Sequence, residues 1–305
     1  MTLVIVGRMT SARPLWLIAA PAVFLVLWSA GFAVAKLGLN HAEPMTLLAL
    51  RYCLVLVVLL PFAIALRPPM PPTRRAWLDV AVVGFLIQVG YFGLCYLAFK
   101  SGVSAAGVAI VVCLQPILVA LIAPRLMGEF VSRQAWAGLS LGLVGALVVI
   151  LARSQGQAEN PWGLLLAVGA LVGITAGTLY EKRFGVSQHP VTSNLIQYAV
   201  GAVVTLPIAL CTESQSISWD GEFIAVMAYL VIGNSLLAMS LLLAMIRVGE
   251  VSRVSALFYL VPAMSALFAW PILGEGMPPL AWLGLALAGA GVALVSRRQK
   301  PAEQV

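Results

Sequence analysis

Charged residues are scarce in this sequence. Only 10% of its 305 residues are Asp, Glu, Lys or Arg, whereas 62% are apolar. Ordinary soluble domains carry about 25% charged residues, and a fold in water has no means of burying apolar side chains in this proportion. The composition therefore excludes a water-soluble globule and indicates a protein of the lipid bilayer.

Acidic residues and histidines are scarcer still, with 11 acids and two histidines in the whole chain. The sequence contains no His-Glu-x-x-His motif and no Gly-x-Ser-x-Gly motif, and no polar constellation falls within an apolar stretch. Catalysis needs such groups, so we expect neither enzymatic activity nor a metal or other cofactor. The four cysteines lie inside apolar stretches without metal-ligand spacing, and we expect them to pack as small hydrophobic residues.

Apolar stretches of about 20 residues, each long enough to cross the hydrocarbon layer as a helix, recur along the whole chain. They are apolar on every side, whereas a membrane barrel needs short alternating segments. We therefore predict an all-α integral membrane protein with ten transmembrane helices. The predicted ranges are 15–36, 45–66, 76–98, 103–126, 133–152, 162–182, 191–211, 222–246, 251–273 and 279–296.

The basic residues, which give the chain a net charge of +7, are distributed unevenly. With the amino terminus placed in the cytoplasm, 14 of the 18 basic residues fall in segments on the cytoplasmic side. This bias follows the positive-inside rule and predicts that both termini lie in the cytoplasm. Because the charge follows the membrane topology, we interpret it as an orientation signal and a contact with anionic lipid, and we expect no nucleic-acid partner.

One motif occurs twice. The segment LQPILVALIAPRLMGE at 114–129 matches LVPAMSALFAWPILGE at 260–275, and the two segments are 146 residues apart. The same offset aligns Trp, Pro, Gly and Glu residues along the rest of the chain without a gap. This regularity indicates an internal duplication, with one repeat at 15–152 and the other at 161–298.

Each predicted repeat contains five spans. Because five is an odd number, the second repeat must enter the membrane in the opposite orientation to the first. Two inverted repeats are an architecture of secondary transporters, in which the substrate site lies between the halves near the bilayer midplane. We therefore expect a carrier that works by alternating access. A channel is the alternative class, but no ring of charge and no filter loop supports it.

Several segments also resemble a known family. LWSAGFAVAKLGL at 27–39, LALRY at 48–52 and AFKSGVSAAGVAIVVCLQPILVALIAPRLMGE at 98–129 are similar to the EamA repeat of the drug/metabolite transporter superfamily, as is SRVSALFYLVPAMSALFAWPILGE at 252–275. The resemblance implies ten helices in two inverted five-helix repeats in a bacterial inner membrane. It also implies export of a small metabolite, with amino acids favoured and drugs or other small metabolites as the alternative.

Polar residues deep in a span cost free energy unless they face a cavity or a partner. Gln88 and Asn234 are deep amides 146 residues apart, and Gln115 lies beside Pro116. Each amide either contacts the substrate, because it can donate to a carboxylate and accept from an ammonium group, or joins two helices. Arg51, about two turns into the second span, either pairs with a substrate carboxylate or has a structural role, which we favour.

Four aromatic residues are candidates for the wall of the substrate pathway: Trp28, Tyr91, Tyr96 and Tyr259. Tyr91 follows Gln88 by three residues, a spacing that places both on one face of an α-helix. Aromatic rings hold apolar groups by contact and ammonium groups by cation–π attraction, whereas the alternative role for each ring is packing. We predict that at least one of the four lines the pathway.

Pro116 and Pro262, also 146 residues apart, fall near the middles of two predicted helices. Proline inside a helix removes a hydrogen bond and produces a kink, which neighbouring helices in a membrane tolerate. The matched pair predicts either bending of the two helices during gating or a static kink that shapes packing.

Two further expectations concern energy coupling and assembly. No acidic residue lies at the centre of a predicted span, so we expect transport without proton coupling through a buried acid. Small residues at four-residue spacing permit close helix crossings. Such crossings can form within one chain or between two chains, so a monomer and a homodimer are both compatible with the sequence.

Overall fold

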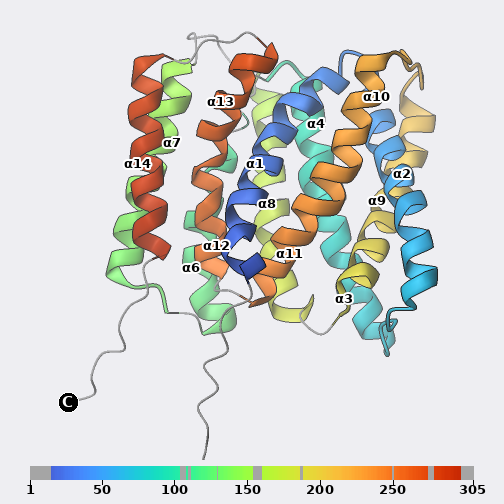
Figure 1. Cartoon of the computed structure of the whole chain (residues 1–305), viewed down its shortest axis with the longest axis horizontal. Coiled ribbons are helices and arrows are strands. Elements are labelled where there is room, and N and C mark those ends of the chain that lie inside the picture. Colours follow the sequence, from blue (N-terminus) through green and yellow to red (C-terminus); the bar gives the residue numbers. More distant parts are fainter. Residues whose placement is uncertain are drawn as a thin grey trace, which may run out of the picture.

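The computed structural model describes residues 15–103, 108, 111–128, 130–153, 160–185, 188–248, 251–273 and 278–296. Within these ranges the chain is helical apart from turns, short connections and an isolated antiparallel β-bridge between Ala42 and Ile217. The helices stand side by side in a bundle (Figure 1). The chain termini lie outside the described residues, so their predicted cytoplasmic position stays a prediction.

Six helical segments of the described chain are long and apolar enough to cross a membrane. They are α1 (Leu15–Gly38), α2 (Pro44–Leu66), the run of α3 (Arg74–Gly84), η1 (Phe85–Gly93) and α4 (Leu94–Lys100), α8 (Pro161–Tyr180) with η2 (Glu181–Gly185), α9 (Pro190–Thr212), and the run of α10 (Gly221–Ala228), η3 (Tyr229–Ala238) and α11 (Met239–Val248). The remaining elements are α6 (Gln115–Met127), α7 (Arg133–Arg153), α12 (Val251–Ala256), η4 (Leu257–Tyr259), α13 (Val261–Leu273) and α14 (Pro279–Ser296). The all-α prediction is confirmed, whereas the count of ten spans stays a prediction.

Two predicted helices are broken where the sequence suggested a kink. A turn at Cys113 and Leu114 precedes α6, and the tight turn η4 separates α12 from α13. Pro116 and Pro262 are each the second residue of the segment that follows the break, so their expected position in mid-helix is wrong. Proline is favoured there because the N–H group that it lacks would have no partner in the first turn. Residues 104–107 and 109–110 of the predicted range 103–126 lie outside the described residues.

Local sequence explains where several helices begin. Pro44, Pro161 and Pro190 occupy the first positions of α2, α8 and α9, where the fixed φ of proline suits the helix. The Asp220 side chain accepts from the N–H group of Phe223 at 2.8 Å. It thereby satisfies a donor that has no partner within α10.

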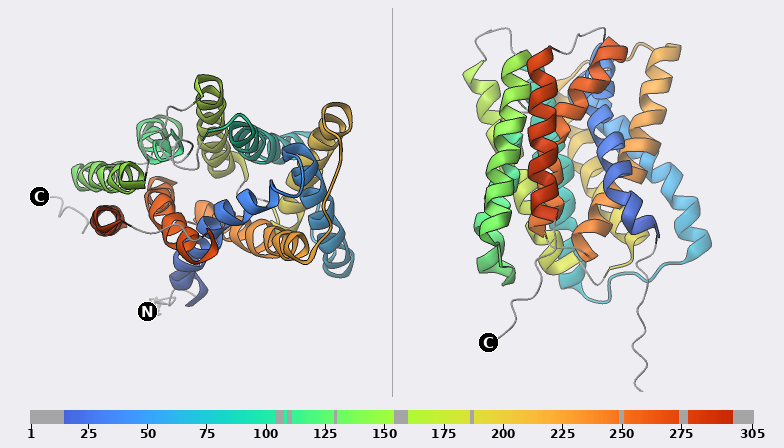
Figure 2. Two further views of the ribbon diagram at one scale, coloured as in Figure 1. Left: turned by 90° about the horizontal axis from the view of Figure 1, so that it is seen from above. Right: turned by 60° about the vertical axis from the view of Figure 1, so that its left-hand side comes forward.

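Two pairs of helices lie at opposite sides of the bundle. α7 packs along α14 at one side and α2 packs along α9 at the other (Figures 1 and 2). Small residues let the first pair approach closely, because a Cβ atom at Gly138 would lie 2.7 Å from the carbonyl oxygen of Gly291. Between the pairs, α1 packs against α13 and η3, and α8 packs against η1 and α4. This central region contains the largest cluster of buried apolar residues.

Two π-helical segments, η1 and η3, interrupt the two longest helical runs. A π-helix closes i→i+5 hydrogen bonds and is wider than an α-helix, and such segments occur frequently at functional sites. The two segments also correspond within the sequence, since 85–93 shifted by 146 residues is 231–239. η1 contains Gln88 and Tyr91, and η3 contains Asn234, so the irregular backbone coincides with three of the predicted site residues.

Candidate functional site

A narrow cavity lies among the central helices. Its described walls come from α1, α2, η1, α4 and η3. The lining residues are Trp28, Gly31, Phe32, Ala35, Arg51, Tyr91, Phe92, Cys95, Tyr96, Phe99 and Asn234. The volume of about 20 Å³ holds about one water molecule, so a metabolite can enter only when the surrounding helices separate.

The cavity extends from the middle of the bundle toward one end. Its outermost residues, Ala35 and Phe99, lie close to the ends of α1 and α4. The next residue after Phe99 is Lys100, which bonds to Glu43 at the start of α2. We call this the Lys100 end, and we call the opposite end, where α11 finishes, the Arg247 end.

Arg51 supplies the positive charge of the cavity. Its side chain is 1% exposed, so it does not extend outward to the membrane surface. Its Nε donates to the Ser235 hydroxyl at 2.7 Å and its Nη2 donates to Asn234 Oδ1 at 2.6 Å. The guanidinium also lies over the Phe92 ring, 4.8 Å from the centroid. These contacts agree with the structural role expected for Arg51, but the side chain also lines the cavity.

The charge of Arg51 has no acidic counterpart in the part of the chain that the structure describes. The ion pairs found there join other residues, near the two ends of the bundle. A buried cation is costly unless an anion and hydrogen bonds compensate for its lost hydration. Ser235 and Asn234 provide neutral acceptors, so the cavity suits an anionic group such as a carboxylate, which arginine binds with two parallel hydrogen bonds.

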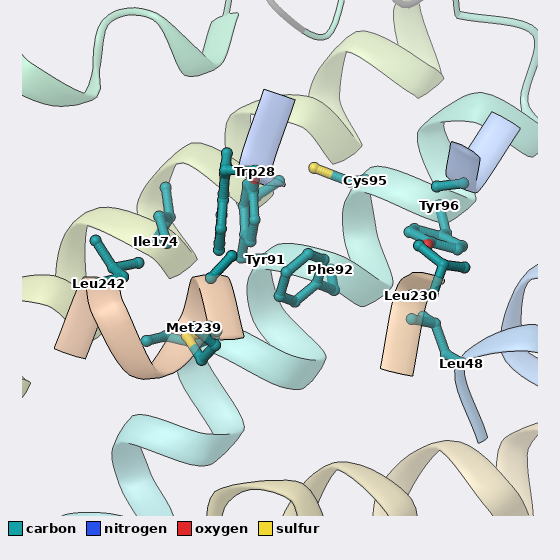
Figure 3. Packing of buried hydrophobic residues seen from close by; sticks show 14 of the residues in the cluster. Trp28, Leu48, Tyr91, Phe92, Cys95, Tyr96, Ile174, Leu230, Met239 and Leu242 are labelled. Carbon is teal, nitrogen blue, oxygen red and sulfur yellow. The ribbon is translucent and has the colours of Figure 1, made fainter. Parts of the chain in front are cut away.

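Aromatic rings form the rest of the cavity wall. The rings of Trp28 and Tyr91 are stacked, with centroids 6.1 Å apart and an interplanar angle of 11°. Figure 3 shows Phe92, Cys95 and Tyr96 on one side of this pair and Ile174, Met239 and Leu242 on the other. Trp28 Nε1 and the Tyr96 hydroxyl form no well-aligned hydrogen bond among the described residues, although they lie near the Tyr91 hydroxyl and the Arg51 guanidinium respectively. These rings thus present a large apolar surface and two polar atoms that a bound molecule can satisfy.

Asn234 reaches the cavity because Gly31 has no side chain. The Asn234 amide accepts from Arg51 and donates from Nδ2 to the carbonyl oxygen of Leu27 at 3.4 Å. A Cβ atom at Gly31 would collide with the Nδ2 of Asn234. Gly31 is therefore required for the close approach of α1 and η3 at this point.

Four of the seven predicted substrate-binding residues line the cavity: Trp28, Tyr91, Tyr96 and Asn234. Gln88 is fully buried but does not line it, although the spacing placed Gln88 and Tyr91 on one helix face. The reason is the π-helical backbone of η1, in which residues three apart no longer lie one above the other. The side chain of Gln88 faces α9. A Cβ atom added at Gly201 on that helix would lie 3.0 Å from the Cβ atom of Gln88.

Gln115 and Tyr259 also lie away from the cavity. Gln115 donates to the Thr178 hydroxyl at 3.3 Å, which joins α6 to α8. Tyr259 packs against α7, where a Cβ atom at Gly142 would lie 2.6 Å from its ring. For these two residues the structure shows contacts between helices rather than a place in the cavity wall.

Sequence reasoning missed seven of the lining residues or assigned them another role: Gly31, Phe32, Ala35, Arg51, Phe92, Cys95 and Phe99. Those on α1 and α4 repeat at spacings of three and four residues, which marks one face of each helix. The spacing does not distinguish this face from the others in the sequence, because the opposite faces of these helices are apolar as well.

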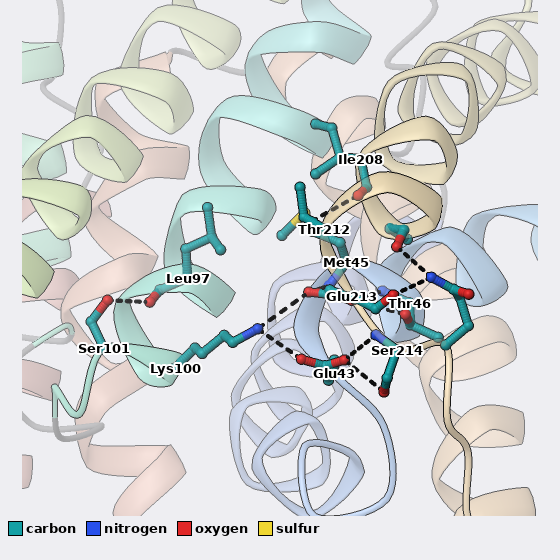
Figure 4. A network of polar contacts seen from close by, with 12 residues as sticks. Glu43, Met45, Thr46, Leu97, Lys100, Ser101, Ile208, Thr212, Glu213 and Ser214 are labelled. Atoms are coloured by element: carbon teal, nitrogen blue, oxygen red, sulfur yellow. Dashed lines mark hydrogen bonds and ion pairs between the residues drawn. The ribbon is translucent and has the colours of Figure 1, made fainter.

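A polar network ties the loops and helix termini together at the Lys100 end (Figure 4). Lys100 Nζ lies 2.9 Å from Glu43 and 3.8 Å from Glu213. Glu213 accepts from the N–H group of Thr46 at 2.7 Å, and Glu43 accepts from the N–H group of Ser214 at 2.6 Å. Bonds from Lys100 and Ser214 lower the pKa of Glu43 from 4.5 to about 2.

A second network lies at the Arg247 end. Arg247 donates to Glu181 at 2.6 Å, to the carbonyl oxygen of Gln188 at 2.6 Å and to the Ser193 hydroxyl at 2.6 Å. Glu181 is 0% exposed and lies near the end of the span Pro161–Phe184 rather than at its centre. The described acids therefore lie at the two ends of the bundle and do not line the cavity.

Comparisons with known proteins show several transporters that this chain resembles. The model of the EamA-like transporter family matches residues 14–151 and again residues 161–297. The uncharacterized inner membrane transporter YedA of Escherichia coli K12 is 24% identical over 89% of this chain and 87% of its own. A probable amino-acid metabolite efflux pump of Salmonella typhimurium is 27% identical over 88% of this chain and 90% of its own. An S-adenosylmethionine/S-adenosylhomocysteine transporter of Chlamydia muridarum is 25% identical over 85% of this chain and 86% of its own.

A protein of known crystal structure shares the fold. It superposes on this chain with a TM-score of 0.78 over 93% of this chain and 97% of its own, at 23% sequence identity. This likeness concerns the arrangement of the helices alone.

Proposed function

Since the chain belongs to the EamA-like transporter family, we propose that it is a secondary carrier that exports amino acids and related metabolites across the bacterial inner membrane. The relatives described as an inner membrane transporter and as an amino-acid metabolite efflux pump support this location and this class of substrate. S-adenosylmethionine, named for a third relative, is itself an amino-acid derivative with an α-carboxylate and an α-amino group.

The observation that carries the proposal is the buried guanidinium of Arg51. It lines the cavity, forms hydrogen bonds only to neutral partners and has no ion-pair partner among the described residues. A substrate carboxylate would neutralise it. The amino group of the same substrate would then lie beside Trp28, Tyr91 and Tyr96, whose ring faces attract cations.

We propose that the fold consists of ten helices in two inverted five-helix repeats, 15–152 and 161–298. Matched hydrogen bonds support this symmetry. The Tyr52 hydroxyl donates to the carbonyl oxygen of Gln88 at 2.7 Å, and the Tyr198 hydroxyl, 146 residues later, donates to that of Ser235 at 2.8 Å, one residue beyond the counterpart of Gln88. The breaks before Pro116 and Pro262 are also matched, and discontinuous helices at the repeat interface are a feature of carriers.

Alternating access follows from this symmetry. The cavity reaches toward the Lys100 end, whereas the Arg247 end is closed by buried ion pairing and by packing of Met239 and Leu242 (Figure 3). In the second state of the carrier the two ends exchange roles. On the distribution of basic residues, we propose that the Arg247 end and both termini lie in the cytoplasm. The breaks before Pro116 and Pro262 are positions at which helix segments can reorient during this exchange.

We propose that transport proceeds without proton coupling through a buried acid. No described acid lines the cavity, and Glu181, which is fully buried, is paired with Arg247. A protonatable group of the pathway would have to be accessible from the cavity. The carrier would then run down the gradient of its substrate.

Export of drugs or other small metabolites is the second candidate. The cavity wall of Trp28, Tyr91, Phe92 and Phe99 favours planar apolar groups as much as amino-acid side chains. A carrier for cationic drugs would lack an acidic partner here, because the charge that lines the cavity is positive. An anionic or neutral solute is the form of this alternative that the cavity fits.

The test is flux into liposomes that contain the purified protein. Liposomes preloaded with each amino acid in turn are mixed with the labelled amino acid, with and without a pH gradient. We expect saturable exchange that ignores the gradient and disappears in Arg51→Gln, whereas exchange by Arg133→Gln, which changes an exposed arginine, stays normal. Flux that requires the gradient would refute the uncoupled mechanism, and absence of flux for every amino acid would favour the second candidate.

A further inference from the structure

Two fully buried glutamines have amides that form no well-aligned hydrogen bond among the described residues, although the Gln88 amide lies near the Tyr198 hydroxyl. They are Gln88 on η1 and Gln197 on α9, each 0% exposed. Most buried polar side-chain atoms in proteins are hydrogen-bonded, and unpaired amides inside a membrane protein are costly. Two such side chains on neighbouring helices therefore require a reason other than the packing seen here.

The two glutamines lie in one seam between neighbouring helices. A Cβ atom at Gly201 would lie 3.0 Å from Cβ of Gln88, and a Cβ atom at Gly84 would lie 2.7 Å from Cα of Gln197. Each glutamine thus stands next to a glycine of the other helix. Neither lines the cavity that contains Arg51, so the seam is separate from the site already described.

The position of the seam is related to the cavity by the repeat. Gln197 is 146 residues after Arg51, and Asn234 is 146 residues after Gln88. Arg51 and Asn234 are hydrogen-bonded to each other and line the cavity on the side of the Lys100 end. Gln197 and Gln88 are therefore the counterparts of that pair on the side of the Arg247 end.

The repeat also relates a residue of α8 to the cavity wall. Thr178 is 146 residues after Phe32, which lines the cavity. The Thr178 hydroxyl accepts from Gln115 Nε2 at 3.3 Å, and Gln115 Oε1 has no partner within the described chain. The repeat thus relates Thr178, the partner of Gln115, to a residue of the cavity wall.

We propose that the seam opens toward the Arg247 end and that Gln88 and Gln197 then form a second, inward-facing binding site for the transported molecule. The inference rests on the proposed carrier function. Each amide donates through its nitrogen to a carboxylate and accepts through its oxygen from an ammonium group, so the site takes a zwitterionic or neutral polar solute. It contains no counterpart of the Arg51 charge, because Gln197 occupies that position. The substrate is therefore held less tightly at the Arg247 end than beside Arg51.

The first experiment measures accessibility. In a background with Cys53, Cys95, Cys113 and Cys211 changed to Ala, the variants Gln88→Cys and Gln197→Cys are treated with a sulfonated, membrane-impermeant maleimide in membrane vesicles of each orientation. The matched control is Thr205→Cys, a buried position two turns along α9 whose hydroxyl bonds to the carbonyl oxygen of Gly201. We expect labelling at least about 10-fold faster than in the control, only from the cytoplasmic side, and slowed by the amino acid that the wild type transports fastest.

Labelling of both glutamine positions no faster than at the control, or labelling only from the opposite side, would overturn the proposal. This result does not depend on the identity of the substrate. If the wild type shows no amino-acid flux but both glutamine positions are labelled from the cytoplasmic side alone, the proposed substrate class is refuted. The opening of the seam toward the Arg247 end is then still supported.

The second experiment separates a binding role from a structural one. We expect Gln197→Leu to reduce exchange about 10-fold or more, while binding of the labelled amino acid from the Lys100 side changes less than about 2-fold. Retained binding shows that the variant is folded, and Gln197→Asn, which keeps the amide, should recover part of the flux. Unchanged exchange in both Gln88→Leu and Gln197→Leu would contradict the inference while leaving the carrier function intact.

Discussion

Arg51 Nη2 donates to Asn234 Oδ1 at 2.6 Å, across a separation of 183 residues in the chain. This bond joins the start of α2 to the π-helical segment η3 and places a buried cation beside a stacked pair of aromatic rings. Neither side chain alone would define a binding site. Together they create a positively charged, partly polar position in an otherwise apolar cavity.

The first prediction concerns the charge itself. Arg51→Gln should weaken binding of an amino acid on the order of 100-fold, because a charge-assisted hydrogen bond contributes about 1.5–3 kcal/mol and a bidentate carboxylate contact contains two. Arg51→Lys keeps the charge but not the planar pair of donors, so its loss should be smaller. Equilibrium binding of labelled amino acids to purified protein measures both. Equal affinity in the wild type and Arg51→Gln would rule out Arg51 as the carboxylate ligand.

The second prediction concerns Gly31. Gly31→Ala places a methyl group where the Asn234 amide lies, so Asn234 must move and its bond to Arg51 must weaken. A misplacement of about 1 Å can reduce activity about 100-fold, and we expect exchange to fall by at least about 10-fold. Gly221→Ala, at a position with open space around it, is the matched control and should transport normally. Normal exchange by Gly31→Ala would show that the Asn234 contact is dispensable.

The third prediction is a pH dependence at the Lys100 end. Bonds from Lys100 and Ser214 lower the pKa of Glu43 from 4.5 to about 2, so the folded state favours the ionised form. The stability from this carboxylate is complete at a pH above 4.5 and is lost as the pH falls through about 2. The Tm of Glu43→Gln should therefore be lower than that of the wild type at pH 7, and the difference should shrink toward pH 2. A constant difference over this range would contradict the assignment, and Glu222→Gln, which changes an exposed acid, is the control.

The fourth prediction concerns the buried ion pair at the Arg247 end. Glu181→Leu leaves Arg247 buried without its acidic partner, a change that costs about 3–5 kcal/mol in other proteins. The double variant Glu181→Leu with Arg247→Met removes both charges and should recover part of the lost stability. Unfolding of the four proteins in a double-mutant cycle measures the coupling. Additive effects would show that the two residues do not stabilise each other.

Several properties of the fold were readable from local sequence. The length and uniform apolarity of the stretches predict membrane helices, and the six long spans begin and end close to the expected ranges. Trp28, Tyr91, Tyr96 and Asn234, which line the cavity, were candidates from the sequence because aromatic and amide groups deep in a span need a partner or a cavity, and their role in binding stays a prediction. In these cases a property of one residue, its size or polarity at a given depth, was sufficient.

The errors arose where the backbone departs from the α-helix. Gln88 lies on a different face from Tyr91 because η1 is π-helical, and Pro116 and Pro262 begin new helical segments rather than bending continuous ones. Both departures depend on backbone hydrogen bonds that neighbouring helices stabilise. A periodicity argument assumes a constant rise and turn, and it fails where those quantities change.

By itself, the sequence determined that the chain enters a membrane, that it does so as helices, and that its two halves are related by an offset of 146 residues. These conclusions follow from composition and spacing, which are properties of the linear chain. Only the tertiary structure decided that Arg51 contacts Asn234, that Glu181 is paired with Arg247, and that Gln88 faces α9 instead of the cavity. The physical reason is that each of these outcomes is a relation between helices distant in sequence, and in a chain whose helices are apolar on every face no pattern specifies which faces meet.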